Sequence, residues 1–298
     1  MTTKRRLSRQ INMQQPLFAF FGTPKFAVDV LQALEKNGLL PALIITAPDR
    51  KSGRGMELKP SPAKQWALER GIDVLEPATL KDEALVQELA NSEWDVFVVA
   101  AYAKLIPKNI LEIPEHGSLN VHPSLLPKFR GPSPALSAIL ADERATGVSV
   151  MQMSEKMDAG PVVAQAKIEL EEDVWPPKGS EFEELLATEG GNLLAETLPF
   201  YLKKEITPET QDESKATFTR KFVDADARID LNGNPHENYL KIRAFDKGPR
   251  AYMLVNNKRV IIKDAEFKNG QLEITRVIPE GKKEMDARSY FSNPSNTL

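Results

Sequence analysis

The sequence predicts an α/β protein in which a parallel sheet is followed by a smaller domain of short strands. The first 200 residues alternate short apolar runs with amphipathic segments, as expected for a parallel sheet that helices cover on both faces. Beyond residue 215, Asn-Asn and Asn-Gly pairs separate short strands, which is typical of antiparallel hairpins. The chain of 298 residues is 41% hydrophobic and 27% charged, so it can bury the core of one or two globular domains.

The first part of the chain follows a regular strand–helix order. We expect strands at 17–22, 42–46, 73–76 and 96–100, and helices at 27–36, 61–70 and 82–89. Ser61 fits the N-cap of the second helix, because Pro62 stands at the first helical position. The turn Gly22-Thr23-Pro24 lacks the Gly-x-Gly-x-x-Gly pattern, so the sequence gives no support for a nicotinamide cofactor.

The pattern changes further along the chain. Residues 146–153 alternate as an antiparallel strand does, and another strand is expected at 162–168. Residues 180–204 predict a helix, with Ser180 and Glu183 at the spacing of a capping box. The last elements are expected to be strands at 259–263, 265–267 and 272–277 and a helix at 236–244.

These patterns divide the chain into four parts. Residues 1–12 are basic but lack the apolar core of a signal peptide, so we expect a disordered extension, after which Met13 opens the folded part. Residues 13–205 are predicted to form the α/β domain, and residues 206–215 have the composition of a linker. Residues 216–298 are predicted to form a small β-barrel-like domain.

Composition excludes several kinds of site. The chain has no cysteine, which excludes disulfides, thiolate catalysis and Cys-based metal sites, and we expect no metal. No apolar run approaches the length of a membrane span, so we expect a cytoplasmic protein without membrane contact. Residues 216–298 carry 15 Lys and Arg against 11 Asp and Glu, whereas the whole chain has a net charge of −3. This basic bias fits contact with nucleic acid, and chance variation on a solvated surface explains it equally well.

A polar pair interrupts the apolar pattern near the middle of the chain. Asn120 and His122 are two residues apart at the end of an expected strand, so their side chains project from the same face. In open α/β sheets, ligands bind at the carboxyl ends of the strands. Residues 123–134 contain four prolines, and such a restricted backbone suits the wall of a pocket. A tight turn beside a hydrogen-bonded core histidine is the alternative that these residues leave open.

Three other segments are candidates for function. Asp158 lies in a predicted tight turn, where Asp usually serves the backbone, but beside a histidine site it becomes the candidate carboxylate partner. Residues 49–60 form a long polar loop containing Arg54 between two glycines; such loops are often functional, although a mobile surface loop has the same composition. Residues 99–107 follow a buried strand at the ligand edge, where an ordinary strand-to-helix turn is the alternative.

Together these motifs resemble those of the folate-dependent formyltransferases, and in particular of the methionyl-tRNA formyltransferases, from about residue 17 to about residue 277. The pattern Asn-x-His-Pro-Ser-Leu-Leu-Pro-x-x-Arg-Gly at residues 120–131 looks like the signature of the group. Further matching motifs lie at 21–28, 48–62, 100–107 and 146–160. The resemblance implies a Rossmann-like formyltransferase domain followed by an oligonucleotide-binding-type β-barrel domain that binds tRNA.

The resemblance also implies an activity and a catalytic set. The reaction would move a formyl group from the co-substrate 10-formyltetrahydrofolate to the α-amine of methionyl initiator tRNA, for translation initiation. The catalytic residues would be Asn120, His122 and Asp158. Asn120 would donate to the oxygen that becomes negative, and His122 would carry the proton between the amine and the folate nitrogen. Asp158 would orient His122 and favour its protonated form.

Binding residues follow from the same resemblance. Arg54 would contact the tRNA, because an arginine can pair with phosphates or base edges. The loop after Ala100 would add backbone contacts to the folate. The folate site would be formed by Ser124, Leu125, Leu126 and Pro127.

The chain departs from the family pattern at several positions. Ala103 stands where glycine is usual, residues 132–134 replace small alanines, and the C-terminal domain is short and lacks a tryptophan near Leu231. A formyltransferase for an amino-sugar nucleotide and a catalytically silent RNA-binding module stay open as alternatives. The Gly-Arg-Gly loop argues against the first, and the intact Asn, His and Asp argue against the second. We expect tRNA and folate as partners and a monomeric protein.

Overall fold

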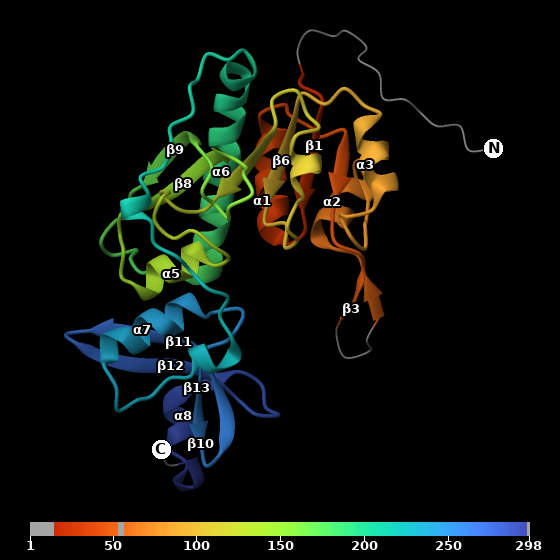
Figure 1. Cartoon of the computed structure of the whole chain (residues 1–298). Coiled ribbons are helices and arrows are strands. Elements are labelled where there is room, and N and C mark those ends of the chain that lie inside the picture. Colours follow the sequence, from red (N-terminus) through yellow and green to blue (C-terminus); the bar gives the residue numbers. More distant parts are fainter. Residues whose placement is uncertain (1–14, 53–56, 297–298) are drawn as a thin grey trace. The chain divides into compact units, whose positions relative to one another are not determined.

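The computed structural model of the chain describes residues 15–52 and 57–296 (Figure 1). The extension expected at residues 1–12 lies outside the described residues. The chain divides into two compact units. The first unit comprises the residues up to Arg130, Gly147–Lys167 and Glu184–Thr217, and the second comprises Gly131–Thr146, Ile168–Glu183 and the residues from Phe218. The domain boundaries expected near residues 205 and 216 stay a prediction.

A seven-stranded sheet is the framework of the first unit (Figure 1). Its order is β5-β2-β1-β6-β7-β8-β9, and every pair from β5 to β7 is parallel, whereas β7 and β8 are antiparallel. The expected parallel sheet and the antiparallel strand near residue 146 are therefore confirmed, in a Rossmann-like α/β arrangement. The strands are β1 (Phe18–Gly22), β2 (Leu43–Ile45), β5 (Asp73–Leu75), β6 (Val96–Ala100), β7 (Ser118–His122), β8 (Thr146–Gln152) and β9 (Val162–Ile168).

Helices cover both faces of this sheet, because successive side chains of a strand point to opposite faces. Phe18 and Phe20 of β1 pack into one core with side chains of α1, α2 and α6. Ala19 and Phe21 pack into a second core with side chains of α3 and α4. The helices are α1 (Lys25–Lys36), α2 (Pro62–Leu68), α3 (Glu83–Ala90), α4 (Lys108–Leu111) and α6 (Gly179–Leu202). The Ser61 hydroxyl accepts from the Lys64 N–H, which confirms the predicted N-cap of α2.

Gly190 allows α6 to approach β7 closely, since an added Cβ would lie 2.4 Å from Cγ1 of Val121. We expect Gly190→Ala to lower the free energy of unfolding by about 1–3 kcal/mol, because the methyl group overpacks the core. Urea unfolding measures this loss. Glu196→Ala, at an exposed position of the same helix, is the control and should change the value by less than about 0.5 kcal/mol. An unchanged urea midpoint for Gly190→Ala would show that α6 can move away from β7.

A four-stranded antiparallel sheet of order β10-β11-β12-β13 organises the second unit. Two-residue turns join its first three strands, and all four turn residues have positive φ: Asn256 (49°), Asn257 (61°), Asn269 (52°) and Gly270 (75°). The predicted hairpin at Asn269-Gly270 is therefore confirmed. The elements are β10 (Tyr252–Val255), β11 (Lys258–Lys268), β12 (Gln271–Pro279), β13 (Met285–Asp286), α5 (Pro134–Leu140), α7 (Pro235–Ala244) and α8 (Ala287–Phe291).

Three local features differ from expectation. The capping box predicted at Ser180 is wrong: α6 begins at Gly179, and the Ser180 N–H and hydroxyl both donate to the Asp246 carboxylate. The helix α5 was not predicted, because proline marks residues 132–134 as a turn. Within the predicted loop 49–60, β3 (Arg50–Ser52) pairs with β4 (Glu57–Lys59) as an antiparallel ribbon. None of the described helices combines the length and the apolar composition needed to span a membrane.

Candidate active site

Strand β7 carries the predicted polar pair at its C-terminal end. Leu119 and Val121 belong to the core under α1 and α6, so Asn120 and His122 face the opposite side of the sheet, as expected. In the registers of the sheet, Asn120 lies opposite Val99 of β6 and His122 opposite Ser149 of β8. Both side chains are buried, with 9% of Asn120 and 4% of His122 exposed. The sheet therefore fixes the two side chains on one face of its carboxyl edge.

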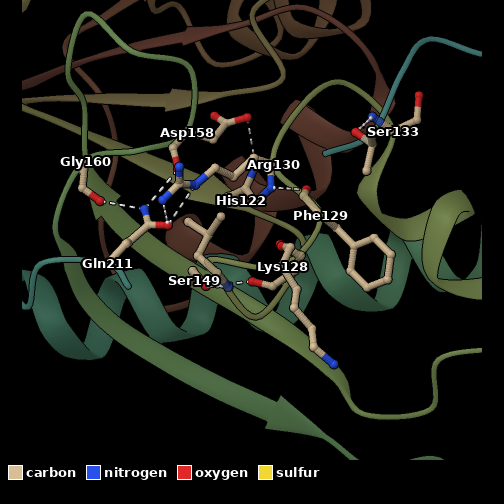
Figure 2. A network of polar contacts seen from close by, with 12 residues as sticks. His122, Lys128, Phe129, Arg130, Ser133, Ser149, Asp158, Gly160 and Gln211 are labelled. Carbon is tan, nitrogen blue, oxygen red and sulfur yellow. Dashed lines mark hydrogen bonds and ion pairs between the residues drawn. The ribbon is translucent and has the colours of Figure 1, made fainter. Parts of the chain in front are cut away.

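The two ring nitrogens of His122 have different partners (Figure 2). Nε2 lies 3.0 Å from the carbonyl oxygen of Phe129, and Nδ1 lies 3.8 Å from Oδ2 of Asp158. A carbonyl oxygen only accepts hydrogen bonds, so Nε2 carries a proton in this arrangement. In the neutral ring Nδ1 is then unprotonated, and it is the atom that can take up a proton. Asp158 faces that atom and would stabilise the imidazolium that results.

Asp158 reaches His122 because of the turn between β8 and β9. Its φ is 50°, in the left-handed region that Asp tolerates better than most residues, and the predicted tight turn is confirmed. The turn also requires Gly160, since a Cβ there would lie 1.8 Å from the carbonyl oxygen of Gln152. The sequence predicted the turn, and the structure shows that it brings the Asp158 carboxylate to His122.

The Asn120 side chain offers an unused donor beside this pair. Within residues 15–52 and 57–296, no hydrogen bond is made by its amide, and its side chain is not completely enclosed. The amide can therefore donate to a ligand that binds at this edge of the sheet.

The predicted folate loop, Ser124–Pro127, is held tightly after His122. The Ser124 N–H donates to the His122 carbonyl at 2.9 Å, and the Ser124 hydroxyl to the Lys128 carbonyl at 2.7 Å. Ser149 of β8 is fully buried, donates to the Ser124 carbonyl at 2.6 Å and accepts from the Leu126 N–H at 3.1 Å. Sequence reasoning did not identify Ser149. The loop is thus a rigid wall beside the histidine.

Sequence reasoning also missed Arg130 and Gln211, which are 2% and 7% exposed. Nε and Nη2 of Arg130 donate to Oε1 of Gln211 at 3.0 and 2.8 Å (Figure 2). Nη1 and Nη2 of Arg130 donate to the Glu213 carboxylate at 3.0 and 2.9 Å. Gln211 belongs to the segment predicted as a linker, yet Glu209 in that segment exchanges two backbone hydrogen bonds of 2.8 Å with Val162. The segment is therefore bound to the edge of the sheet.

Comparison with known proteins gives the family. The sequence matches the formyl transferase family over residues 16–178. It is 43% identical over 236 residues to the methionyl-tRNA formyltransferase of Chloroflexus aggregans, covering 78% of this chain and 74% of that protein. It is 34% identical over 296 residues to the methionyl-tRNA formyltransferase of Methylococcus capsulatus, covering 92% of this chain and 95% of that protein. The chain belongs to the methionyl-tRNA formyltransferase family.

The fold is shared more widely than the methionyl-tRNA formyltransferase family. A sugar N-formyltransferase from Shewanella has a similar structure, with a TM-score of 0.60 at 17% identity, covering 90% of this chain and 99% of that chain. At this identity the likeness concerns the fold alone. The fold therefore does not by itself identify the substrate.

Tyr102, which lies just after β6, is a further residue that sequence reasoning missed. Its ring packs edge-on against Phe21 at 5.5 Å, and burial raises the pKa of its hydroxyl to about 12. The hydroxyl is buried and has no hydrogen-bond partner among the described residues. It remains protonated at neutral pH, so it can donate to a ligand bound at this edge of the sheet.

Arg54, the predicted tRNA contact, lies outside the described residues. The strands β3 and β4 flank it in sequence and pair with each other over Arg50–Lys59, Lys51–Leu58 and Ser52–Glu57. The role of Arg54 stays a prediction.

The ion pair of Arg130 and Glu213 gives a pH-dependent prediction. Hydrogen bonds from Arg130 hold the pKa of Glu213 below its ordinary value of 4.5. A carboxyl whose folded-state pKa is depressed stabilises the protein above its unfolded pKa and loses this contribution as the pH falls through the folded value. We expect Glu213→Gln to lower the thermal midpoint at pH 7, and the difference from wild type to shrink as the pH falls below 4.5 to values at which Glu213 is protonated. Thermal melts between these values test it, and an equal difference at both ends would contradict it.

Proposed function

We propose that the chain transfers the formyl group of 10-formyltetrahydrofolate to the α-amine of methionyl initiator tRNA, for translation initiation. The observation that carries the proposal is the arrangement at the end of β7, where Nδ1 of His122 faces Asp158 and the Asn120 amide has no hydrogen-bond partner in the described part of the chain. Transfer of an acyl group between two amines needs a group that moves a proton and a donor for the acyl oxygen. The similarity to methionyl-tRNA formyltransferases over most of the chain supports the choice of acceptor.

Each of the three side chains has a separate task in this reaction. The folate supplies the formyl group from its N10 nitrogen. His122 would take at Nδ1 the proton that the attacking amine loses, and would return it to the folate nitrogen as the old C–N bond breaks. Asp158 would stabilise the positive ring in between, and the Phe129 carbonyl keeps the proton on Nε2. Asn120 would donate to the formyl oxygen as negative charge develops there.

The residues at the sheet edge fit a folate. A pterin is a flat ring with many hydrogen-bonding groups, so it needs polar donors set between apolar walls. The Ser124–Pro127 loop supplies leucine side chains on a backbone held by Ser149. The Tyr102 hydroxyl, which has no partner among residues 15–52 and 57–296, supplies a donor. We infer that this loop and the residues after Ala100 hold the folate beside His122.

In this proposal the second unit binds the tRNA. We propose that its antiparallel sheet belongs to an oligonucleotide-binding-type barrel. In support, the register between β11 and β12 shifts at Ile262 and Asp264, and such bulges bend strands at barrel corners. We keep the predicted boundaries, with a catalytic domain at 13–205, a linker at 206–215 and this domain at 216–298. A monomeric, cytoplasmic enzyme without a metal completes the proposal.

A formylation assay with purified protein distinguishes the proposed acceptor from the alternative. The protein would be incubated with the formyl donor and either methionyl initiator tRNA or an amino-sugar nucleotide. We expect kcat/KM for the tRNA to exceed that for the sugar nucleotide. The shared fold of the Shewanella sugar N-formyltransferase is the reason for including the second acceptor. A preference for the sugar nucleotide would overturn the proposed function, and binding of tRNA without turnover would indicate a silent RNA-binding protein.

Arg54→Ala tests the predicted tRNA contact. An arginine cannot donate its proton at neutral pH, so Arg54 is expected to act in binding and not in proton transfer. We expect the substitution to weaken tRNA use by about 1–3 kcal/mol if the contact is a bidentate one to a base edge. Measuring kcat/KM for charged tRNA, with turnover of a small amine as the control reaction, separates binding from chemistry. Unchanged tRNA affinity and kcat/KM would remove Arg54 from the interface.

A further inference from the structure

The Gln211 side chain contacts the backbone of the Asp158 turn (Figure 2). Nε2 of Gln211 donates to the Asp158 carbonyl at 2.9 Å and to the Gly160 carbonyl at 2.7 Å. These two carbonyls flank Ala159, so one amide group clamps the turn from which the Asp158 carboxylate projects. The clamp matters because Asp158 has positive φ, a conformation that needs surrounding contacts to persist.

Arg130 determines which way the Gln211 amide points. Its Nε and Nη2 both donate to Oε1 of Gln211, at 3.0 and 2.8 Å. The amide oxygen must face these donors, and the amide nitrogen must then face the two carbonyls. A reversed amide would set its oxygen against carbonyl oxygens and its N–H groups against a guanidinium. Burial of both side chains makes that arrangement costly, so a single orientation is selected.

The same segment of chain also supports His122. Six residues after Gln211, Thr217 accepts from the Phe129 N–H at its hydroxyl (2.8 Å) and from the Arg130 N–H at its carbonyl (2.9 Å). The Thr217 N–H donates to the Pro127 carbonyl at 3.2 Å. These bonds fix the backbone at Phe129, whose own carbonyl contacts Nε2 of His122. Residues 211–217 therefore contact the supports of both members of the pair.

We propose that Gln211 is a positioning residue for the reaction, acting through Asp158, and that Arg130 sets its orientation. Gln211 does not touch the reacting atoms in this scheme. It holds the Asp158 carboxylate in front of Nδ1 of His122, at 3.8 Å, where the negative charge stabilises the imidazolium. The part of this inference that concerns rate rests on the proposed formyl transfer.

A double-mutant cycle tests whether Gln211 acts through Asp158. We expect Gln211→Ala to lower kcat by about 100-fold, as small misplacements of catalytic groups do, with KM for both substrates nearly unchanged. In an Asp158→Asn background the same substitution should change kcat by less than about two-fold, because the group it positions no longer carries charge. Gln211→Glu keeps an acceptor for Arg130 but removes both donors, so it should resemble Gln211→Ala. Gln87→Ala and Gln87→Glu, on the exposed side of α3, are the controls.

An NMR titration of the free protein tests the same inference without any substrate. The chain has only three histidines, so the His122 ring signal is assignable from single substitutions. We expect Asp158→Asn to change the pH dependence of this signal, because the carboxylate that faces Nδ1 at 3.8 Å is removed. Gln211→Ala and Gln211→Glu should change the pH dependence in the same direction as Asp158→Asn, whereas the Gln87 variants should leave it unchanged. Because this readout does not depend on the acceptor, it separates failure of this inference from failure of the proposed function.

The outcomes distinguish positioning from support of the fold. If Gln211 only stabilised the fold, its variants would lower the thermal midpoint, leave the His122 titration in place, and add their loss of kcat to that of Asp158→Asn. Either the unmoved titration or the additive losses would overturn the proposal. If Gln211→Ala were unfolded at the assay temperature, Gln211→Glu would carry both measurements, because it retains the Arg130 contact.

Discussion

His122→Ala is expected to lower kcat by about 100- to 10,000-fold, the range by which a positioned general acid–base group accelerates a reaction. His122 is the only titratable side chain on the described part of β7, and its Nδ1 is the ring atom left free to take a proton. The imidazole is 4% exposed, so bulk water cannot easily replace it as proton carrier. Alanine would leave the attacking amine without a base and the folate nitrogen without an acid.

Folate binding separates this chemical role from a structural one. We expect the dissociation constant of the folate, measured by calorimetry, to change little in His122→Ala, because the Ser124–Pro127 loop is held mainly by Ser149. His236→Ala is a matched control, since His236 also pairs with a carboxylate, Asp142, at 3.0 Å, but belongs to the second unit. Its kcat at saturating tRNA should match that of wild type. Near-normal turnover of His122→Ala would remove this residue from the mechanism.

Much of the fold follows from local sequence rules. Continuous apolar runs predicted β1 and β6 to within one residue, because strands of a parallel sheet are buried on both faces and are therefore apolar along their whole length. The Asn269-Gly270 turn was predicted because few residues adopt positive φ without strain. The capping box predicted at Ser180 was wrong because Ser180 makes a tertiary hydrogen bond instead of a local one. Its partner Asp246 is 66 residues away, and no local rule reports a competing tertiary hydrogen bond.

The candidate site likewise contains residues that local sequence rules identify and residues that they do not. Asn120 and His122 could be predicted as neighbours, since residues two apart in a strand share a face. Asp158 was found as a turn residue, but its distance from His122 depends on how β8 and β9 pack. Arg130 belongs to the motif at residues 120–131, but its partner Gln211 carries no local signal. They are 81 residues apart, and a glutamine in a polar segment looks like part of a linker until the guanidinium that it meets is known.

Asn120→Ala is expected to lower kcat by about 100- to 1000-fold, as the loss of one preorganised donor to a developing oxyanion does. Because the wild-type amide has no partner among the described residues, the substitution breaks no hydrogen bond of the free protein. We therefore expect the thermal midpoint to stay the same or to rise, which is unusual for a substitution in a buried strand. Rapid-mixing single-turnover measurements and thermal melts give the two values.

Asn120→Asp tests whether the donor itself matters, because it keeps the shape of the side chain and replaces the donor by an acceptor. We expect it to be at least as slow as Asn120→Ala, since a carboxylate would repel the formyl oxygen as negative charge develops on it. KM for the folate should change far less than kcat in Asn120→Ala, because the donor is needed most after the charge begins to form. A large rise in KM with normal kcat would assign Asn120 to substrate binding. Normal activity of both variants would show that Asn120 does not donate to the oxyanion.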